Sequence, residues 1–211
     1  LPLPPKLSNM SEKQLPFMIY AEVTPNPATM KFVSNHMLVQ NDAVYEFSNE
    51  SDAQHAPLAA RLFSFPFIQK VFITQNFITL TKMEGVEWDE VMLELREYIS
   101  NFLNAGHAII DEAATSVAGE ERKESGITDH SAAETPIEEK IIEILDEYIR
   151  PAVEGDGGAI HFKSFEEGKL NVVLKGACSG CPSSSITLKA GIKALFERML
   201  PEVKEVVAEE L

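Results

Sequence analysis

Thiols, positive charges and long apolar runs are all scarce in this chain of 211 residues. It contains 2 cysteines, too few for the disulfide networks that staple small secreted domains. Lys and Arg number 18 against 33 Asp and Glu, which gives a formal net charge of −15. Phosphate backbones repel such a surface, so no nucleic-acid partner is expected. No apolar stretch approaches the roughly 20 residues that cross a bilayer, so no membrane partner is expected either.

The remaining composition is ordinary for a globular protein, with 45% hydrophobic and 24% charged residues. The first residues, "LPLPPKLSNM", lack the basic-then-apolar layout of a secretory signal. We expect residues 1–15 to form a disordered tail and the protein to be cytoplasmic. In that reducing compartment a close pair of thiols is more often a metal or redox site than a structural bridge.

The composition changes sharply after Asn104. Residues 105–134 are rich in Ala, Ser, Thr, Gly and Glu and include no aromatic residue. Such a segment has little apolar surface to offset the entropy lost on ordering. We therefore expect a flexible acidic linker at 105–134, between one domain at 16–104 and another at 135–211. The expected fold class is α+β, in two small domains of mixed helices and strands.

The first domain shows both strand and helix patterns. Residues 18–24, 31–39 and 43–48 are typical of strands, and residues 71–82 predict two strands joined at Gln75-Asn76. A short helix is predicted over 56–65 and a longer one over 87–106, where apolar residues recur at helical spacing. This half contains no cysteine and no glycine-rich phosphate loop, so it indicates no chemistry of its own.

The second domain is predicted to begin with a helix. Thr135 suits the N-cap, Pro136 the first helical position, and Glu138 the reciprocal position of a capping box. Pro151 is expected just beyond the end of this helix. Its buried stripe is predicted to consist of Ile137, Ile141, Ile144, Leu145 and Tyr148.

A hairpin and a second helix are predicted to follow. After a tight turn at 155–158, residues 159–165 and 169–175 read as two strands, and residues 203–209 as a last strand. Alternation predicts that the inward residues of the hairpin are Ile160, Phe162, Leu170, Val172 and Leu174. The second helix is predicted to bury Ile186, Leu188, Ile192, Leu195, Phe196 and Met199.

Both cysteines lie between the hairpin and this second helix, in "KGACSGCPSSS". Pro182 suits the first helical position, so Cys181 falls at or beside the N-cap and Cys178 in the loop before it. The unpaired N–H groups and the positive end of the helix dipole favour the thiolate, which is the metal-binding and nucleophilic form. We expect the flanking glycines to leave Cys178 and Cys181 reachable.

A C-x-x-C pair alone permits several sites. A structural disulfide is disfavoured by the compartment and by the very small loop it would close. A thioredoxin-type oxidoreductase also places C-x-x-C between a strand and a helix, but only 30 of the 211 residues follow Cys181, too few for the rest of that fold. Zinc bound within one chain needs two more ligands. Only His161 is near in sequence, and it is interpreted as a strand histidine on a partly solvated face.

A second copy of the chain is the remaining source of ligands. Two-fold pairing would bring both cysteine pairs together and supply the four thiolates that a 4Fe–4S cluster requires. A cluster held in this way is easily surrendered, because parting the two copies removes half of its ligands.

Several stretches resemble the iron–sulfur scaffold proteins of the NifU/Nfu family. The C-terminal domain of that family is similar to residues 135–209, through "GDGGAIHF" and "LNVVLKGACSGCPSSSITLKAGIKALFERMLPEV". The N-terminal domain found in many Nfu proteins is similar to "TPNPATMKF" and "APLAARLFSFPFIQKVFITQNFITLTK". One departure is Ala159, where the family often has Asp or Asn.

The resemblance implies a carrier rather than an enzyme. A homodimer would hold a 4Fe–4S cluster through Cys178 and Cys181 of each copy, receive it from an upstream donor, and pass it to apo iron–sulfur proteins. For the first domain it implies a role in recognising targets or in tuning. The alternative function is a thiol–disulfide oxidoreductase that uses the same C-x-x-C pair.

Overall fold

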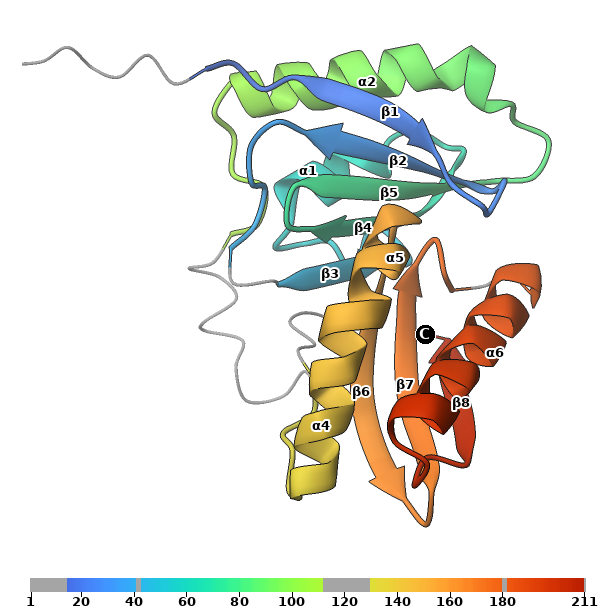
Figure 1. Ribbon diagram of the computed structural model, residues 1–211. Coiled ribbons are helices and arrows are strands. Elements are labelled where there is room, and N and C mark those ends of the chain that lie inside the picture. Colours follow the sequence, from blue (N-terminus) through green and yellow to red (C-terminus); the bar gives the residue numbers. More distant parts are fainter. Residues whose placement is uncertain (1–14, 41–42, 112–129, 180–181, 211) are drawn as a thin grey trace, which may run out of the picture.

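The computed structural model describes residues 15–40, 43–111, 130–179 and 182–210, with backbone only for 182–185 and 210. Residues 1–14 of the expected tail at 1–15, residues 112–129 of the expected linker at 105–134, and Cys181 lie outside the described residues. In the described ranges, no helix has both the length and the apolar character needed to cross a bilayer. The predicted α+β fold in two domains is confirmed, because each half contains its own sheet, helices and buried core (Figure 1).

The first domain is built on a five-stranded antiparallel sheet in the order β1-β2-β5-β4-β3. Its strands are β1 (Ile19–Val23), β2 (Thr29–Ser34), β3 (Val44–Phe47), β4 (Ile68–Thr74) and β5 (Phe77–Lys82). The tight β4–β5 turn forms at the predicted Gln75-Asn76 junction, where Gln75 has a positive φ of 34°.

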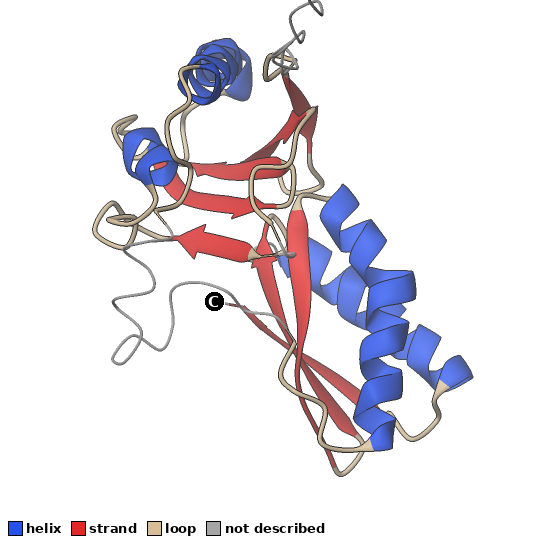
Figure 2. Cartoon of the chain, turned by 90° about the vertical axis from the view of Figure 1, so that its left-hand side faces the viewer, coloured by secondary structure: helices blue, strands red, loops and turns tan. Residues whose placement is uncertain are grey.

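Two helices, α1 (Pro57–Leu62) and α2 (Trp88–Asn104), pack against one face of this sheet. Leu95 and Ile99 of α2 are fully buried in the same core as Phe32, Ile78 and Leu80 of the sheet. Because side chains alternate along a strand, the neighbouring residues of these strands point to the other face. That second face meets the C-terminal domain, so the sheet lies between its own helices and the second domain (Figure 2).

The second domain starts with a nearly continuous helical segment. It consists of α4 (Pro136–Ile144), the π-helical segment η1 (Leu145–Ile149) and α5 (Arg150–Gly155). The predicted capping box is confirmed: Thr135 Oγ1 accepts the Glu138 N–H at 3.3 Å, and Glu138 Oε2 accepts the Thr135 N–H at 2.9 Å. Both bonds satisfy backbone N–H groups that have no acceptor within the helix at its N-terminus.

Two details predicted for this helix are wrong, and η1 is the reason for both. Pro151 does not lie beyond the end, since helical structure continues through it to Gly155. It falls in the first turn of α5, where a missing N–H is tolerated. Tyr148 is 47% exposed instead of belonging to the buried stripe. A π turn holds about one residue more than an α turn, which rotates the side chains after it away from an unbroken stripe.

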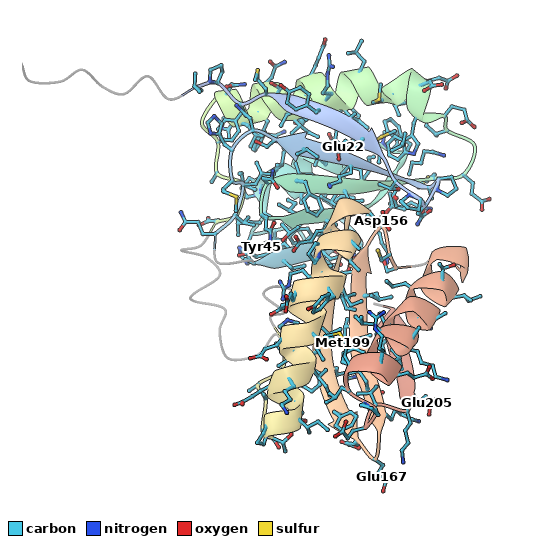
Figure 3. The ribbon with its side chains drawn as sticks, viewed as in Figure 1. Glu22, Tyr45, Asp156, Glu167, Met199 and Glu205 are labelled. Atoms are coloured by element: carbon cyan, nitrogen blue, oxygen red, sulfur yellow. The ribbon has the colours of Figure 1, made fainter. Side chains whose placement is uncertain are left out.

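The rest of the domain is a three-stranded sheet and one helix. The strands β6 (Gly158–Glu166), β7 (Lys169–Gly176) and β8 (Glu205–Glu210) lie in the order β6-β7-β8, with β6 antiparallel and β8 parallel to β7. The five predicted inward residues of the hairpin are all buried. Figure 3 labels Glu167 at the hairpin tip, far from the first domain, and Asp156 at the opposite end, next to it.

Helix α6 (Pro182–Met199) begins at Pro182, as predicted. Ile192 and Phe196 are fully buried, but Ile186 and Met199 are 69% and 39% exposed, so the prediction that they are buried is wrong. Ile186 belongs to the first turns of the helix and Met199 is its last residue. Each therefore lies at an end of α6, outside the central part that packs on the sheet.

The capping box at α4 leads to a first prediction. Thr135→Ala should reduce the protection of α4 amides against hydrogen exchange by about 1 kcal/mol, because a side-chain cap is lost. Glu87 occupies the N-cap of α2 without a side-chain cap bond, so Glu87→Ala should change α2 protection by less than about 0.5 kcal/mol. Equal losses in the two helices would show that the capping bonds are not what stabilises the start of α4.

Candidate functional site

Cys178 lies in the loop that joins β7 to α6, as the sequence predicted. Cys181 and the side chains of residues 182–185 lie outside the described part of the chain, so the pairing of Cys178 with Cys181 stays a prediction. Since α6 starts at Pro182, the loop leads into the N-terminal, electropositive end of an 18-residue helix. Residues 176–179 are called the cysteine loop below.

The cysteine loop folds back on itself and on the turn before β6. Gly176 has a positive φ of 66°, a backbone conformation that glycine adopts without strain. Its carbonyl accepts both the Ser179 N–H at 3.1 Å and the Ser179 hydroxyl at 3.0 Å. The Ala177 N–H donates to the Gly157 carbonyl at 3.1 Å. The backbone beside Cys178 is therefore fixed by hydrogen bonds on both sides of its sequence position.

The Cys178 side chain is buried, with 4% of its surface exposed. This overturns the expectation of a reachable thiol at that position. Its sulfur packs over Gly158: a Cβ added there would lie 2.8 Å from Cys178 Sγ and 2.7 Å from the Lys175 carbonyl oxygen. The glycine before Ala159 therefore gives the cysteine room to turn inward, whereas the sequence suggested that glycines would keep it open.

The described residues provide no ready-made metal site around this cysteine. In the described ranges, no group of three or more His, Cys, Asp and Glu residues lies close enough together to hold a metal ion. The histidine nearest in sequence, His161, is only 3% exposed, so its predicted place on a partly solvated face is wrong. The reason is His130, which precedes α4: its ring packs edge-on to His161 at 6.0 Å, and its Nδ1 accepts the Phe162 N–H at 2.8 Å.

Three polar side chains of the first domain bind the cysteine loop and the turn beneath it. Asn26 Nδ2 donates to the Ala177 carbonyl at 3.2 Å, and Glu46 Oε1 accepts the Gly176 N–H at 3.2 Å. Thr79 Oγ1 donates to the Gly157 carbonyl at 2.7 Å. None of these three contacts was predicted from the sequence, because polar residues on strands and turns carry no signal that separates such a contact from an ordinary solvated surface.

Two charged groups lose hydration at this contact: Lys175 is buried, and Glu46 is half-buried. Burial raises the pKa of Glu46, against the lowering effects of Lys70, the Gly176 N–H and Lys175. Burial also lowers the pKa of Lys175, against the raising effect of Glu46. Each group thus loses more hydration than its neighbours replace, which is the usual cost of a charge in a partly apolar environment.

Each of the two domains matches a known family of its own. Residues 19–106 match the family described as the N-terminal domain of scaffold protein Nfu/NifU, and residues 141–207 match the family described as the NifU-like domain. The β7–α6 loop with Cys178 falls in the second match, and Asn26, Glu46 and Thr79 fall in the first.

Three curated relatives are proteins named "NFU1 iron-sulfur cluster scaffold homolog, mitochondrial". The one from Drosophila sechellia is 34% identical over 89% of this chain and 63% of its own length. The one from Drosophila persimilis is 36% identical over 89% of this chain and 64% of its own. The chain thus spans less than two thirds of the length of these two. The relative from Drosophila willistoni is 34% identical over 97% of this chain and 68% of its own length.

These relatives contradict the expected cytoplasmic location. All three are mitochondrial proteins by name, which points to the mitochondrion instead. The expected location was inferred from the first few residues of the chain, and those do not determine the compartment. Among solved structures, a NifU-like protein from Saccharomyces cerevisiae aligns with 50% of this chain and 92% of its own at 24% identity, but its TM-score of 0.40 is too low to bear on the fold.

The two family matches lie in the order N-terminal domain, then NifU-like domain, and the Drosophila willistoni relative covers almost the whole chain. On that basis, this chain belongs to the Nfu/NifU family of iron–sulfur cluster scaffold proteins.

Proposed function

We propose that this protein carries a 4Fe–4S cluster as cargo, bound between two copies of the chain by Cys178 and Cys181 of each copy. It receives the cluster from an upstream donor and passes it to apo iron–sulfur proteins. The observation that carries the proposal is the position of the C-x-x-C sequence, which spans the β7–α6 loop of a NifU-like domain and ends directly before the first residue of α6.

The supply of ligands supports the sharing of one cluster by two copies. Iron in a 4Fe–4S cluster takes four protein thiolates, and the chain contains 2 cysteines. In the part of the chain that the structure describes, no cluster of acidic or histidine side chains offers substitutes. A symmetric pair of chains doubles the thiols without any further ligand type.

Transfer by ligand exchange fits such a site. A thiol of the recipient gives up its proton, and its sulfur forms a bond to one iron while the bond from that iron to Cys178 or Cys181 breaks. The released cysteine takes a proton. Each step replaces one Fe–S bond by another, so no iron is left without a ligand. The cargo leaves chemically unchanged, and for this reason we propose a carrier and not an enzyme. None of the comparisons supports the alternative, a thiol–disulfide oxidoreductase.

Anaerobic reconstitution with iron and sulfide tests the proposed function. The wild-type chain should bind about four Fe per dimer and become dimeric as it loads. Cys178→Ser and Cys181→Ser should each lose stable iron binding and the dimer together, because a hydroxyl is a poor substitute for thiolate on iron. Ser179→Ala alters the same loop but keeps both sulfurs, so it should still load.

Iron content measured together with the mass of the complex in solution separates the outcomes. A loaded protein that stays monomeric, or one that holds a single iron per chain, would contradict the proposal. Steady reduction of a model disulfide by the metal-free protein would support the oxidoreductase instead.

Gly158 provides a prediction for the loop itself. In Gly158→Ala the new methyl group would meet the Lys175 carbonyl at 2.7 Å and Cys178 Sγ at 2.8 Å, so the sulfur has to leave its position. Cys178 in the metal-free variant should therefore react faster with thiol reagents, and the protein should be destabilised by about 1–3 kcal/mol. Gly191 on α6 has no atom within 4 Å of an added Cβ, so Gly191→Ala should leave thiol reactivity unchanged. Equal thiol reactivity in both variants would show that Gly158 does not seat the cysteine.

A further inference from the structure

We propose that the open face of the N-terminal sheet is a docking surface for the cysteine loop of its own chain, and that this contact has to open before Cys178 can bind the cluster. The proposal rests on the proposed function. Asn26, Glu46 and Thr79 then act as positioning residues that hold the thiol in its buried state. Asn26 and Glu46 bond to the backbone just before Cys178, and Thr79 bonds to the Gly157 carbonyl, which also accepts the Ala177 N–H.

The polar part of the docking surface is one row of residues across the whole sheet. The strand register aligns Glu22, Lys31, Thr79, Phe72 and Glu46 side by side on β1, β2, β5, β4 and β3. Four of the five meet the second domain. Lys31 Nζ donates to the Gly155 carbonyl at 3.3 Å, Thr79 and Glu46 make the bonds given above, and Phe72 packs against Gly176. The fifth, Glu22, pairs with Lys31 at 3.5 Å.

The neighbouring row on the same face is mostly apolar. It contributes Val33, Phe77 and Val44, which form a separate small core with Phe72 and with Ala159 of β6. Val44, Phe72 and Phe77 are each no more than 3% exposed. Without the second domain these side chains would be a continuous apolar patch on a sheet face that no helix of the first domain covers, and such a patch usually marks an interaction site.

The second domain is shaped for close approach to this face. Gly157 and Gly176 both have positive φ, of 84° and 66°. A Cβ at Gly157 would lie 3.0 Å from Thr79 Oγ1, and one at Gly176 would lie 3.2 Å from the Phe72 ring. Side chains at either position would therefore press against the sheet. The backbone of these two glycines therefore lies directly against the surface of the sheet.

Burial of Cys178 makes this contact relevant to cluster binding. At 4% exposure, its sulfur cannot reach an iron that a second copy also binds unless the cysteine loop moves. Two backbone groups of the loop itself, the Gly176 N–H and the Ala177 carbonyl, are bonded to the first domain. Movement of the loop therefore breaks these bonds, so docking of the first domain and sharing of a cluster compete for the same loop.

The charges at the contact favour a reversible association. Glu46 and Lys175 both lose hydration there. For charged groups in a partly apolar environment, desolvation offsets most of the attraction between opposite charges, so such groups add little net stability. A contact stabilised by a few hydrogen bonds and a small apolar cluster can open locally at a modest free-energy cost.

The rate of Cys178 alkylation by iodoacetamide in metal-free protein tests the proposal directly. All proteins carry Cys181→Ser, so that Cys178 is the only thiol. Asn26→Asp keeps the side-chain oxygen that accepts the Ala28 N–H. It replaces the amide group that donates to the Ala177 carbonyl by a carboxylate oxygen, which repels that carbonyl. Thr79→Val removes the donor to Gly157 and keeps the shape of the side chain. Each substitution should accelerate alkylation about fivefold or more, as expected for loss of one buried hydrogen bond.

Two matched variants serve as controls. Asn35 has the same two roles as Asn26, accepting the Met18 N–H and donating to the Pro16 carbonyl, but both partners lie in its own domain. Thr81 lies on β5 two residues after Thr79, on the same face of the sheet. Asn35→Asp and Thr81→Val should therefore alkylate within about twofold of the parent.

Equal rates in Thr79→Val and Thr81→Val would overturn the proposal, and so would an acceleration in Asn35→Asp as large as in Asn26→Asp. Hydrogen exchange of the amides in β2 and β5 checks that each variant is folded. If Asn26→Asp unfolds, the isosteric variant Thr79→Val alone tests the proposal. The measurement uses no iron. If alkylation accelerates but reconstitution fails, the docking surface stands and the proposed cargo is wrong. If alkylation is unchanged but the protein loads normally, the cargo stands and the docking surface is wrong.

Discussion

The hydrogen bonds that tie the glycine-rich loops of the second domain to the open sheet face of the first determine how this molecule presents its chemistry. Thr79 and Glu46 bind backbone groups of Gly157 and Gly176, and both glycines lie where a side chain would block the approach. The same loops bring the Cys178 sulfur over Gly158. One contact between the domains therefore sets the relative position of the two sheets and, on our proposal, the exposure of a cluster ligand (Figure 1).

Much of the fold follows from local sequence. Periodicity and turn residues predicted the strands, the Thr135 capping box, the α6 start at Pro182 and the inward residues of the hairpin, because each depends on neighbours in the chain. The errors have a different origin. The π segment rotates Tyr148 out of its stripe and carries the helix through Pro151, and no local pattern announces a π turn. His161 is buried by His130, which lies 31 positions earlier in the sequence.

The candidate site, too, combines features that local sequence predicts with features that depend on distant residues. The sequence placed Cys178 between a strand and a helix N-terminus, but its burial depends on Gly158 and on the core of the second domain, which are contacts made at long range in the sequence. Asn26, Glu46 and Thr79 are separated from their partners in the second domain by 151, 130 and 78 residues, so no local pattern could reveal the contacts. Burial of the thiol in the resting chain and its release on loading give one account of why a scaffold would keep a second domain. On this proposal, the metal-free protein guards Cys178 against oxidation and unwanted metals until a partner copy is at hand.

The Gly176 amide reports most directly on this account, because its N–H is donated to Glu46 of the other domain. Hydrogen exchange at Gly176 can be compared between the metal-free and the cluster-loaded protein. The account predicts that this amide is protected in the metal-free chain and exchanges markedly faster once the cluster is bound, while amides in the middle of β7 keep their protection. Protection of Gly176 that is unchanged or greater in the loaded protein would contradict the claim that the domains separate to release Cys178.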